Sequence, residues 1–405
     1  MKTVDAKPLL LHNRAFTLLF AARAISVLGN GFARVALAFA VLGLPGATPT
    51  ELSVVLACQA LPQLLFVLLG GVIADRTSRS GLMIVADVIG LLAYGAMAVV
   101  LLSGQATIPV LAALAVVSGI PLPLFLPALS GVVPEIVPTE RLQQANALLQ
   151  SAVSLSLVLG FGLSGLVVSL VGAGWAIALN AASFLVSAVL VGAMRLPPQA
   201  RATAKSGWVD LRDGWREFSS RQWLWVMVLQ STVTVAGIVA VTGVLGPLAA
   251  EDGLGGAPAW SVIVACHSLG MLAGSTVARH LRPRRPLLTA VLLSFVYPLP
   301  MVLLGVVAPV WLTALSMFAC GVAGSWFGVL WMTTVQREVP AESLSRVSSY
   351  DLFGQLTLAP LTLLFVGPLA QSFGYGAVLV WFGALVLLSS LGALLSPQVR
   401  RLSSG

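Results

Sequence analysis

The chain carries few charged residues. Of its 405 residues, 9% are charged and 58% are hydrophobic, whereas about 25% of the residues in a typical soluble domain are charged. This composition excludes an ordinary soluble domain and indicates an integral membrane protein. The hydrophobic residues stand in continuous runs of about 20, the length of a membrane-spanning helix, rather than in the alternating stretches of about 10 that transmembrane strands require. We therefore expect an all-α membrane protein.

Reactive and nucleotide-binding motifs are also scarce. The three cysteines, Cys58, Cys266 and Cys320, each lie inside a hydrophobic run, which excludes a disulfide framework and a metal-ligand spacing. The sequence has no G-x-x-x-x-G-K-[ST] run, so ATP hydrolysis by this chain is not expected. Its His, Cys and carboxylate residues form no cluster that would support catalysis. We expect neither an enzyme nor a bound cofactor or metal.

Basic residues are distributed unevenly along the chain. The net charge of +8 could suggest a nucleic-acid partner, but the positions of the charges favour a membrane topology instead. With a cytoplasmic N-terminus, 20 of the 22 Lys and Arg residues fall on cytoplasmic segments or helix ends, and the outer loops receive none. The positive-inside rule thus predicts a multi-pass protein of the cell inner (cytoplasmic) membrane with both termini cytoplasmic. The twelve predicted spans are residues 14–42, 50–74, 81–103, 107–134, 142–170, 174–194, 222–249, 259–280, 286–307, 310–336, 343–370 and 374–396.

The second half of the chain repeats the first. The sequence VPTERL at residues 137–142 reappears as VPAESL at residues 339–344, and Gly165 corresponds to Gly367 at the same offset. Because each repeat holds an even number of spans, both halves enter the membrane in the same orientation. A substrate path between the halves follows.

The repeat divides the chain into three parts. Residues 1–194 and 222–405 are predicted to form two six-helix bundles that bind lipid on their outer faces. The polar stretch 195–221 between them predicts a cytoplasmic linker with an amphipathic helix on the inner membrane surface.

A charged turn separates the second and third predicted spans. Its sequence, GGVIADRTSRSG at residues 70–81, has glycines that let two helices approach closely and charged side chains suited to water or to neighbouring helix ends. Taken alone, it is also compatible with a solvated loop that obeys the positive-inside rule. By sequence and position it resembles the loop signature of the major facilitator superfamily of transporters. The resemblance implies a gating loop that contacts the opposite half, and the residues that match it are Gly71, Asp75, Arg76 and Arg79. Since the signature's later glycine and basic residue are Ser78 and Ser80 here, a reduced charge network is expected.

Two further stretches resemble one branch of this superfamily. VPEIVP at 133–138 and LNAASFL at 179–185 are similar to a bacterial exporter branch that includes enterobactin exporters and macrolide efflux pumps. The resemblance implies a secondary transporter that works by alternating access and exports a small amphipathic organic compound, such as a drug-like metabolite or siderophore, in exchange for protons. The Gly-Pro pair of the superfamily's antiporter signature is absent, because Phe161 follows Gly160. The direction of transport therefore stays open.

Other functions stay compatible with the sequence. An importer or facilitator of an organic anion would suit two arginines in the first span. A non-transporting membrane sensor or scaffold would need neither a polar cavity nor the repeat. For any of these the chain is expected to act as a monomer.

The first span carries one polar stripe. Arg23, Asn30 and Arg34 are spaced so that on a helix they lie within roughly 20° of one line and spread over about 16 Å. Arginine inside a bilayer costs about 2.5 to 3.5 kcal/mol or more, so each is a functional candidate. We predict that the stripe lines the central cavity and attracts an anionic or acceptor-rich group of the substrate. The alternative is that Arg23 and Arg34 extend toward opposite membrane faces as anchors.

Asp87, about two turns into the third span, has two interpretations. A carboxylate at that depth could exchange a proton as its surroundings alternate between wet and buried, which would make Asp87 the proton-coupling residue. It could instead pair with Arg76 or Arg79 as part of the gate, and the sequence favours this pairing.

Several polar and aromatic residues within the spans could contact a bulky substrate, although each could equally face another helix. They are Gln59, Gln63, Gln230, Trp326 and Trp331.

Overall fold

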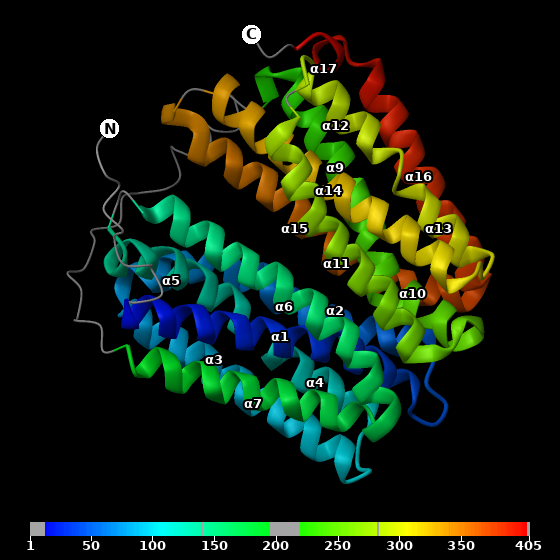
Figure 1. The fold of residues 1–405 in the computed structure, drawn as a ribbon. Coiled ribbons are helices and arrows are strands. Elements are labelled where there is room, and N and C mark those ends of the chain that lie inside the picture. Colours follow the sequence, from blue (N-terminus) through cyan, green and yellow to red (C-terminus); the bar gives the residue numbers. More distant parts are fainter. Residues whose placement is uncertain (1–12, 139–140, 195–218, 282, 340, 403–405) are drawn as a thin grey trace.

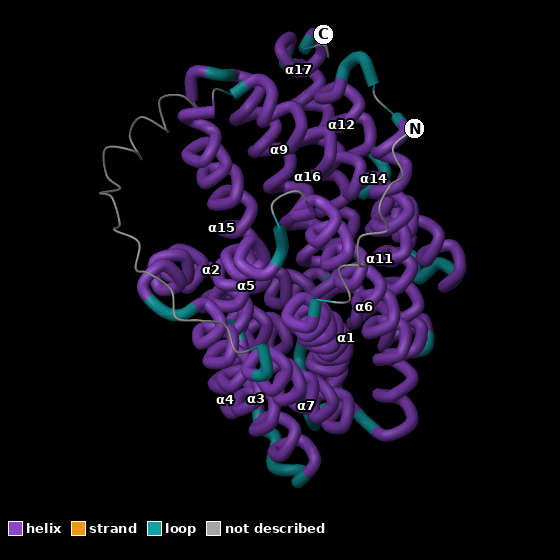
Figure 2. Tube along the Cα trace, turned by 60° about the vertical axis from the view of Figure 1, so that its left-hand side comes forward, coloured by secondary structure: helices purple, strands orange, loops and turns teal. Residues whose placement is uncertain are grey.

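The computed structural model of the chain describes residues 13–138, 141–194, 219–281, 283–339 and 341–402. Within them, the side chains of residues 67–72, 74–76, 143, 147, 279–280 and 341–356 are not described. The described secondary structure is helical, with loops and turns between the helices (Figure 2). The linker was predicted over residues 195–221, and its residues 195–218 lie outside the described part of the chain.

The helices follow the predicted spans closely. The first half contains α1 (Arg14–Leu42), α2 (Pro49–Arg76), α3 (Arg79–Leu102), α4 (Ile108–Ser118), α5 (Pro121–Ile136), α6 (Leu142–Val171) and α7 (Ala173–Gly192). The second contains α9 (Gln222–Ala240), the π-helical segments η3 (Val241–Leu245) and η4 (Ala250–Leu254) around α10 (Gly246–Ala249), α11 (Gly256–His280), α12 (Pro286–Ser294), α13 (Pro298–Gly305), α14 (Val310–Glu338), α15 (Ala341–Phe373), α16 (Tyr375–Leu395) and α17 (Pro397–Arg401). Ten described helical stretches are long and apolar enough to cross a membrane. The second and eleventh predicted spans correspond to α2 and α15, which are not among these ten stretches. The count of twelve spans therefore stays a prediction.

Local sequence determines where the first helices begin. The Asn13 side chain caps α1 by accepting a hydrogen bond from the Ala15 backbone N–H at 3.0 Å, which satisfies a donor that a helix start leaves open. Its amide nitrogen donates to the Ile136 carbonyl at 2.7 Å and so joins the start of α1 to the end of α5. At α2, Thr48 and Glu51 form a reciprocal capping box.

Three predicted spans are interrupted rather than continuous. The fourth is divided into α4 and α5 just before Pro121, and the ninth into α12 and α13 just before Pro298. Proline lacks the N–H that a helix needs at these points and disfavours helical geometry in the residue before it. The seventh span contains η3, and η4 follows directly after its predicted end; in both segments the hydrogen-bond register widens by one residue.

The largest contacts between the two halves are those of α6 with α11 and of α2 with α15, and α1 makes smaller contacts with α10 and α11. We call the end of the bundle that carries Asn13 and Leu402 the terminal end, and the end that carries the 43–48 turn the opposite end. Figure 1 shows the halves converging at the opposite end, near α10, and diverging toward the terminal end.

Two glycines related by the repeat make the contacts at the opposite end. A Cβ on Gly165 of α6 would overlap the Ala257 carbonyl and the Ser261 side chain at the start of α11. A Cβ on Gly367 of α15 would overlap the Pro49 carbonyl and the Ser53 side chain at the start of α2. Thr50 also donates to the Gln371 side chain at 2.5 Å. The opposite end is therefore closed by backbone-to-backbone packing that only glycine permits.

Candidate functional site

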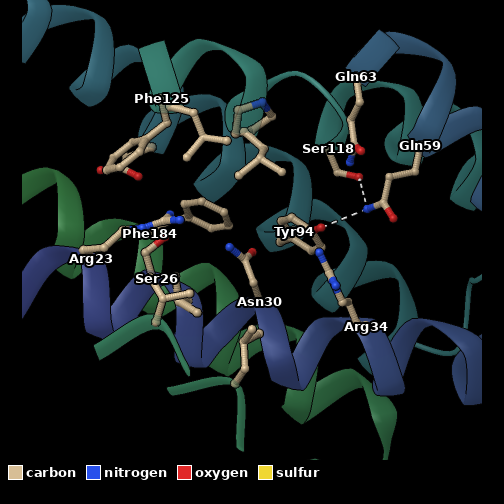
Figure 3. A pocket seen from close by; sticks show the side chains of 17 residues that line it. Arg23, Ser26, Asn30, Arg34, Gln59, Gln63, Tyr94, Ser118, Phe125 and Phe184 are labelled. Atoms are coloured by element: carbon tan, nitrogen blue, oxygen red, sulfur yellow. Dashed lines mark hydrogen bonds between the residues drawn. The ribbon is translucent and has the colours of Figure 1, made fainter. Parts of the chain in front are cut away.

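A polar cavity of about 260 Å³ lies inside the first half. We call it the N-half cavity (Figure 3). Its lining residues come from α1 to α7 and are Arg23, Ser26, Val27, Asn30, Arg34, Gln59, Gln63, Asp87, Tyr94, Ser118, Pro121, Leu122, Phe125, Leu126, Val153, Leu157 and Phe184. It thus holds six of the residues that the sequence singled out, including Gln59 and Gln63.

One wall of the cavity is the polar stripe of α1. Figure 3 shows Arg23, Asn30 and Arg34 projecting from α1 into the same space. Residues 31–33 and 35–41 are buried, yet Arg34 among them is exposed, so its accessible surface belongs to the cavity. Among the described residues no carboxylate forms an ion pair with Arg34. The structure brings the three side chains together as the helical spacing predicted, and their role in binding stays a prediction.

A hydrogen-bonded group faces Arg34 across the cavity. The Gln59 amide nitrogen donates to the Tyr94 hydroxyl and to the Ser118 hydroxyl, both at 2.9 Å (Figure 3). Tyr94 stacks on Phe184 with ring centroids 5.7 Å apart and planes inclined by 16°. An aromatic surface therefore lies close to a guanidinium that no described carboxylate pairs with, which suits a ligand that carries both a ring and an acceptor group.

Sequence reasoning missed Tyr94, Ser118 and Phe184. For Tyr94 a signal existed, because it lies seven residues after Asp87 and seven residues return to nearly the same helix face. Ser118 and Phe184 reach the cavity from other helices. Phe184 belongs to the LNAASFL stretch, but neither residue's local sequence shows that its side chain faces the cavity.

Asp87 is almost fully buried at the base of the cavity, with 1% of its surface exposed. One carboxylate oxygen accepts a hydrogen bond from the Ser187 hydroxyl at 2.7 Å. The other oxygen has no hydrogen-bond partner among the described residues. Arg23 is the nearby cation that acts on Asp87 electrostatically, and its guanidinium lies over the Phe125 ring, 5.7 Å from the centroid.

The expected pairing of Asp87 with Arg79 is not what the structure shows. The Arg79 guanidinium instead contacts the Gly131 carbonyl at 2.7 Å and the Glu135 carboxylate at 2.5 Å. These contacts join the start of α3 to α5, within one half, because Arg79 is the first residue of α3 and reaches the neighbouring end of α5. The side chains of the other gating-loop residues, Gly71, Asp75 and Arg76, lie outside the described set.

A second cavity, of about 220 Å³, lies in the other half between α9, α12 and α14. We call it the C-half cavity. Gln230 and Trp331 line it, and the Gln230 amide nitrogen donates to Thr234 at 3.0 Å and Ser390 at 3.3 Å. Trp326 is not among its lining residues, and its indole nitrogen is buried without a described partner.

Among the residues that the structure describes, no three His, Cys, Asp or Glu side chains gather closely enough to hold a metal ion. What the N-half cavity offers is a cationic and aromatic binding surface beside one buried carboxyl group.

Comparison with known proteins finds transporters of similar sequence. The chain is 25% identical to the multidrug efflux pump Tap of Mycolicibacterium fortuitum over 430 aligned residues, which cover 99% of this chain and 98% of that protein. It is 29% identical to the uncharacterized MFS-type transporter YkuC of Bacillus subtilis (strain 168) over 189 residues, 47% of this chain and 44% of that protein.

Solved structures share the fold. The D323A mutant of the nucleoside transporter NupG superposes with a TM-score of 0.81 at 12% identity and covers 94% of this chain and 99% of its own. An inward-facing, unoccupied bacterial homologue of the human lysosomal transporter Spinster superposes with a TM-score of 0.76 at 12% identity, over 98% of both chains. The sequence model of the Major Facilitator Superfamily matches residues 19–359. With the helical bundle, the repeat and this match in agreement, the chain belongs to the major facilitator superfamily of transporters.

Proposed function

We propose that the chain exports small amphipathic organic compounds in exchange for protons, with the N-half cavity as the substrate site. The observation that carries the proposal is the composition of this one cavity. It joins a free guanidinium at Arg34, the stacked rings of Tyr94 and Phe184, and the buried carboxyl group of Asp87. The similarity to a multidrug efflux pump over nearly the full chain supports export of drug-like compounds.

Asp87 is the proposed coupling residue. A carboxyl group that alternates between a dry and a wet environment can take a proton from one side of the membrane and release it on the other. Its free oxygen and its position at the cavity base would let substrate and proton influence each other. Alternating access would follow from opening of the glycine contacts at the opposite end while the terminal end closes.

A second candidate, an importer or facilitator of an organic anion, is favoured by one observation. The Arg34 guanidinium is exposed to the cavity and no described carboxylate pairs with it. A carboxylate or phosphate on the substrate would complete this site. Dependence of flux on a proton gradient separates the two functions.

The test is proton movement in liposomes that contain the purified protein and an internal pH dye. A panel of amphipathic cations, neutral macrocycles and organic anions is added, and we expect at least one class to drive proton flux. If correctly folded protein showed no proton flux with any compound of the panel, proton-coupled export would be contradicted.

Asp87→Asn is expected to abolish transport driven by a pH gradient while downhill exchange of the same compound continues, because the amide cannot carry a proton. Glu51→Gln is the matched control, since it makes the same change at the start of α2, where glutamine can also complete the capping box. Normal pH-driven transport by Asp87→Asn would assign the coupling to another group.

A further inference from the structure

A groove of about 360 Å³ lies between α9 and α16, outside both cavities described above. We call it the α9–α16 groove. Its lining residues come from α9 and from the end of α16 and include Trp225, Leu229, Gln230, Gly392, Leu395 and Ser396. None of them is charged, and they occupy the terminal-end part of both helices.

The groove opens toward the membrane. Trp225, Leu229 and Leu395 at its rim are 42%, 60% and 78% exposed, and large apolar side chains on the outer face of a spanning helix meet lipid. Trp225 lies near the start of its helix, where tryptophan commonly marks the level of the lipid headgroups. In the predicted orientation the groove therefore faces the cytoplasmic leaflet.

Two of the residues that line this groove each have a buried polar atom without a hydrogen-bond partner among the described residues. The two atoms are Gln230 Oε1 and Ser396 Oγ, in side chains that are 2% and 5% exposed. Buried polar atoms are nearly always paired, so an orphan of this kind calls for an explanation. The Gln230 amide nitrogen already donates to Thr234 and Ser390, so what this residue still offers is an acceptor.

We propose that the α9–α16 groove binds a neutral amphiphile from the membrane that carries a hydrogen-bond donor, such as an alcohol or an amide. The donor of the ligand meets Gln230 Oε1. The absence of charge in the lining excludes an ionic headgroup, which would be desolvated there without compensation. The apolar chain of the ligand lies along Leu229 and Leu395, as a lipid tail would.

Gln230 lines both the α9–α16 groove and the C-half cavity. A transported compound could therefore enter the protein from the leaflet at this residue. That passage rests on the proposed function, whereas binding in the groove does not.

The test is photolabelling of the full chain in lipid nanodiscs, which requires no transport and so stays independent of the export experiment. The probe is a long-chain alcohol with a diazirine on the chain, compared with its methyl ether and with a diazirine phosphatidylcholine, neither of which has a donor. We expect the alcohol to label peptides 222–230 and 389–396, at least about threefold more than the ether, as one neutral hydrogen bond predicts. Equal labelling by the alcohol and the ether would overturn the proposal, and so would equal labelling by the phospholipid, which would make the groove an ordinary lipid contact.

Two variants and one control test where the ligand lies in the groove. A Cβ on Gly392 meets no atom within 4 Å, so a side chain at this position starts in open space, and the indole of Gly392→Trp should occupy the groove and remove the labelling. Leu391→Trp is the matched control, because Leu391 is 45% exposed on the same helix but outside the lining. Gln230→Leu should remove the difference between alcohol and ether. Persistent labelling in Gly392→Trp, or a preference for the alcohol retained in Gln230→Leu, would contradict the proposed position of the ligand.

Discussion

Replacing Arg34 by alanine is expected to weaken binding of an anionic or acceptor-rich substrate by about 10- to 100-fold, which corresponds to the loss of one hydrogen bond from a charged donor. Arg34 is the exposed residue in an otherwise buried stretch of α1, and its accessible surface lies in the N-half cavity. Arg34→Lys should recover part of the affinity, since it keeps the charge but loses the planar pair of donors. Binding and flux are measured on the same reconstituted protein.

Arg14→Ala is the control for the Arg34 variants. Arg14 is exposed at the first residue of the same helix and does not line the cavity, so its loss should leave affinity unchanged. If Arg34→Ala and Arg34→Lys both kept normal affinity and specificity, the stripe would be a set of membrane anchors, as the alternative from the sequence had it.

Gly165→Ala is expected to open the opposite end of the bundle. A Cβ at this position overlaps the Ala257 carbonyl, a backbone atom that cannot turn aside. Overpacking of this kind costs about 1–3 kcal/mol, and about 1.4 kcal/mol is a factor of ten in an equilibrium. The balance between closed and open states should therefore shift by roughly 5- to 150-fold toward the open one.

The measurement is the rate at which a thiol reagent labels Ser53→Cys in a chain whose three cysteines have been replaced. Ser53 is buried at the Gly367 contact between α15 and α2. Its labelling therefore reports opening of the whole opposite end, and not only of the Gly165 contact that the substitution alters. Gly162→Ala serves as the control, because its Cβ would make an ordinary contact at 3.7 Å with Ala265 in the same interface. Equal labelling rates in the two variants would show that Gly165 does not hold this end closed.

Much of the fold was predictable because membrane insertion imposes simple rules on the sequence. The first helix, Arg14–Leu42, has the bounds predicted for it, since a hydrophobic run and a capping Asn13 coincide there. The breaks before Pro121 and Pro298 and the π segments near Gly246 were not placed. Hydrophobicity measures how long a span is, but it is insensitive to a change in hydrogen-bond register inside that span.

The site was predictable only where one helix carries it. Arg23, Asn30 and Arg34 could be grouped because helical geometry alone determines their relative positions. The bond between Ser187 and Asp87 joins residues 100 positions apart and depends on how α3 and α7 are rotated about their own axes. No pattern within a single sequence specifies those rotations, and the contact of Arg79 with Glu135 could not be predicted for the same reason.

Ser53 and Ser261 make the closed opposite end sensitive to water. Each is buried against a glycine of the other half, and neither hydroxyl has a hydrogen-bond partner among the described residues. When the halves part at this end, both hydroxyls become hydrated, so opening takes up water at one site in each half. Cosolutes excluded from protein surfaces favour the less hydrated state. Rising osmolality should therefore hold the chain in its present arrangement and slow every cycle that has to pass through the open one.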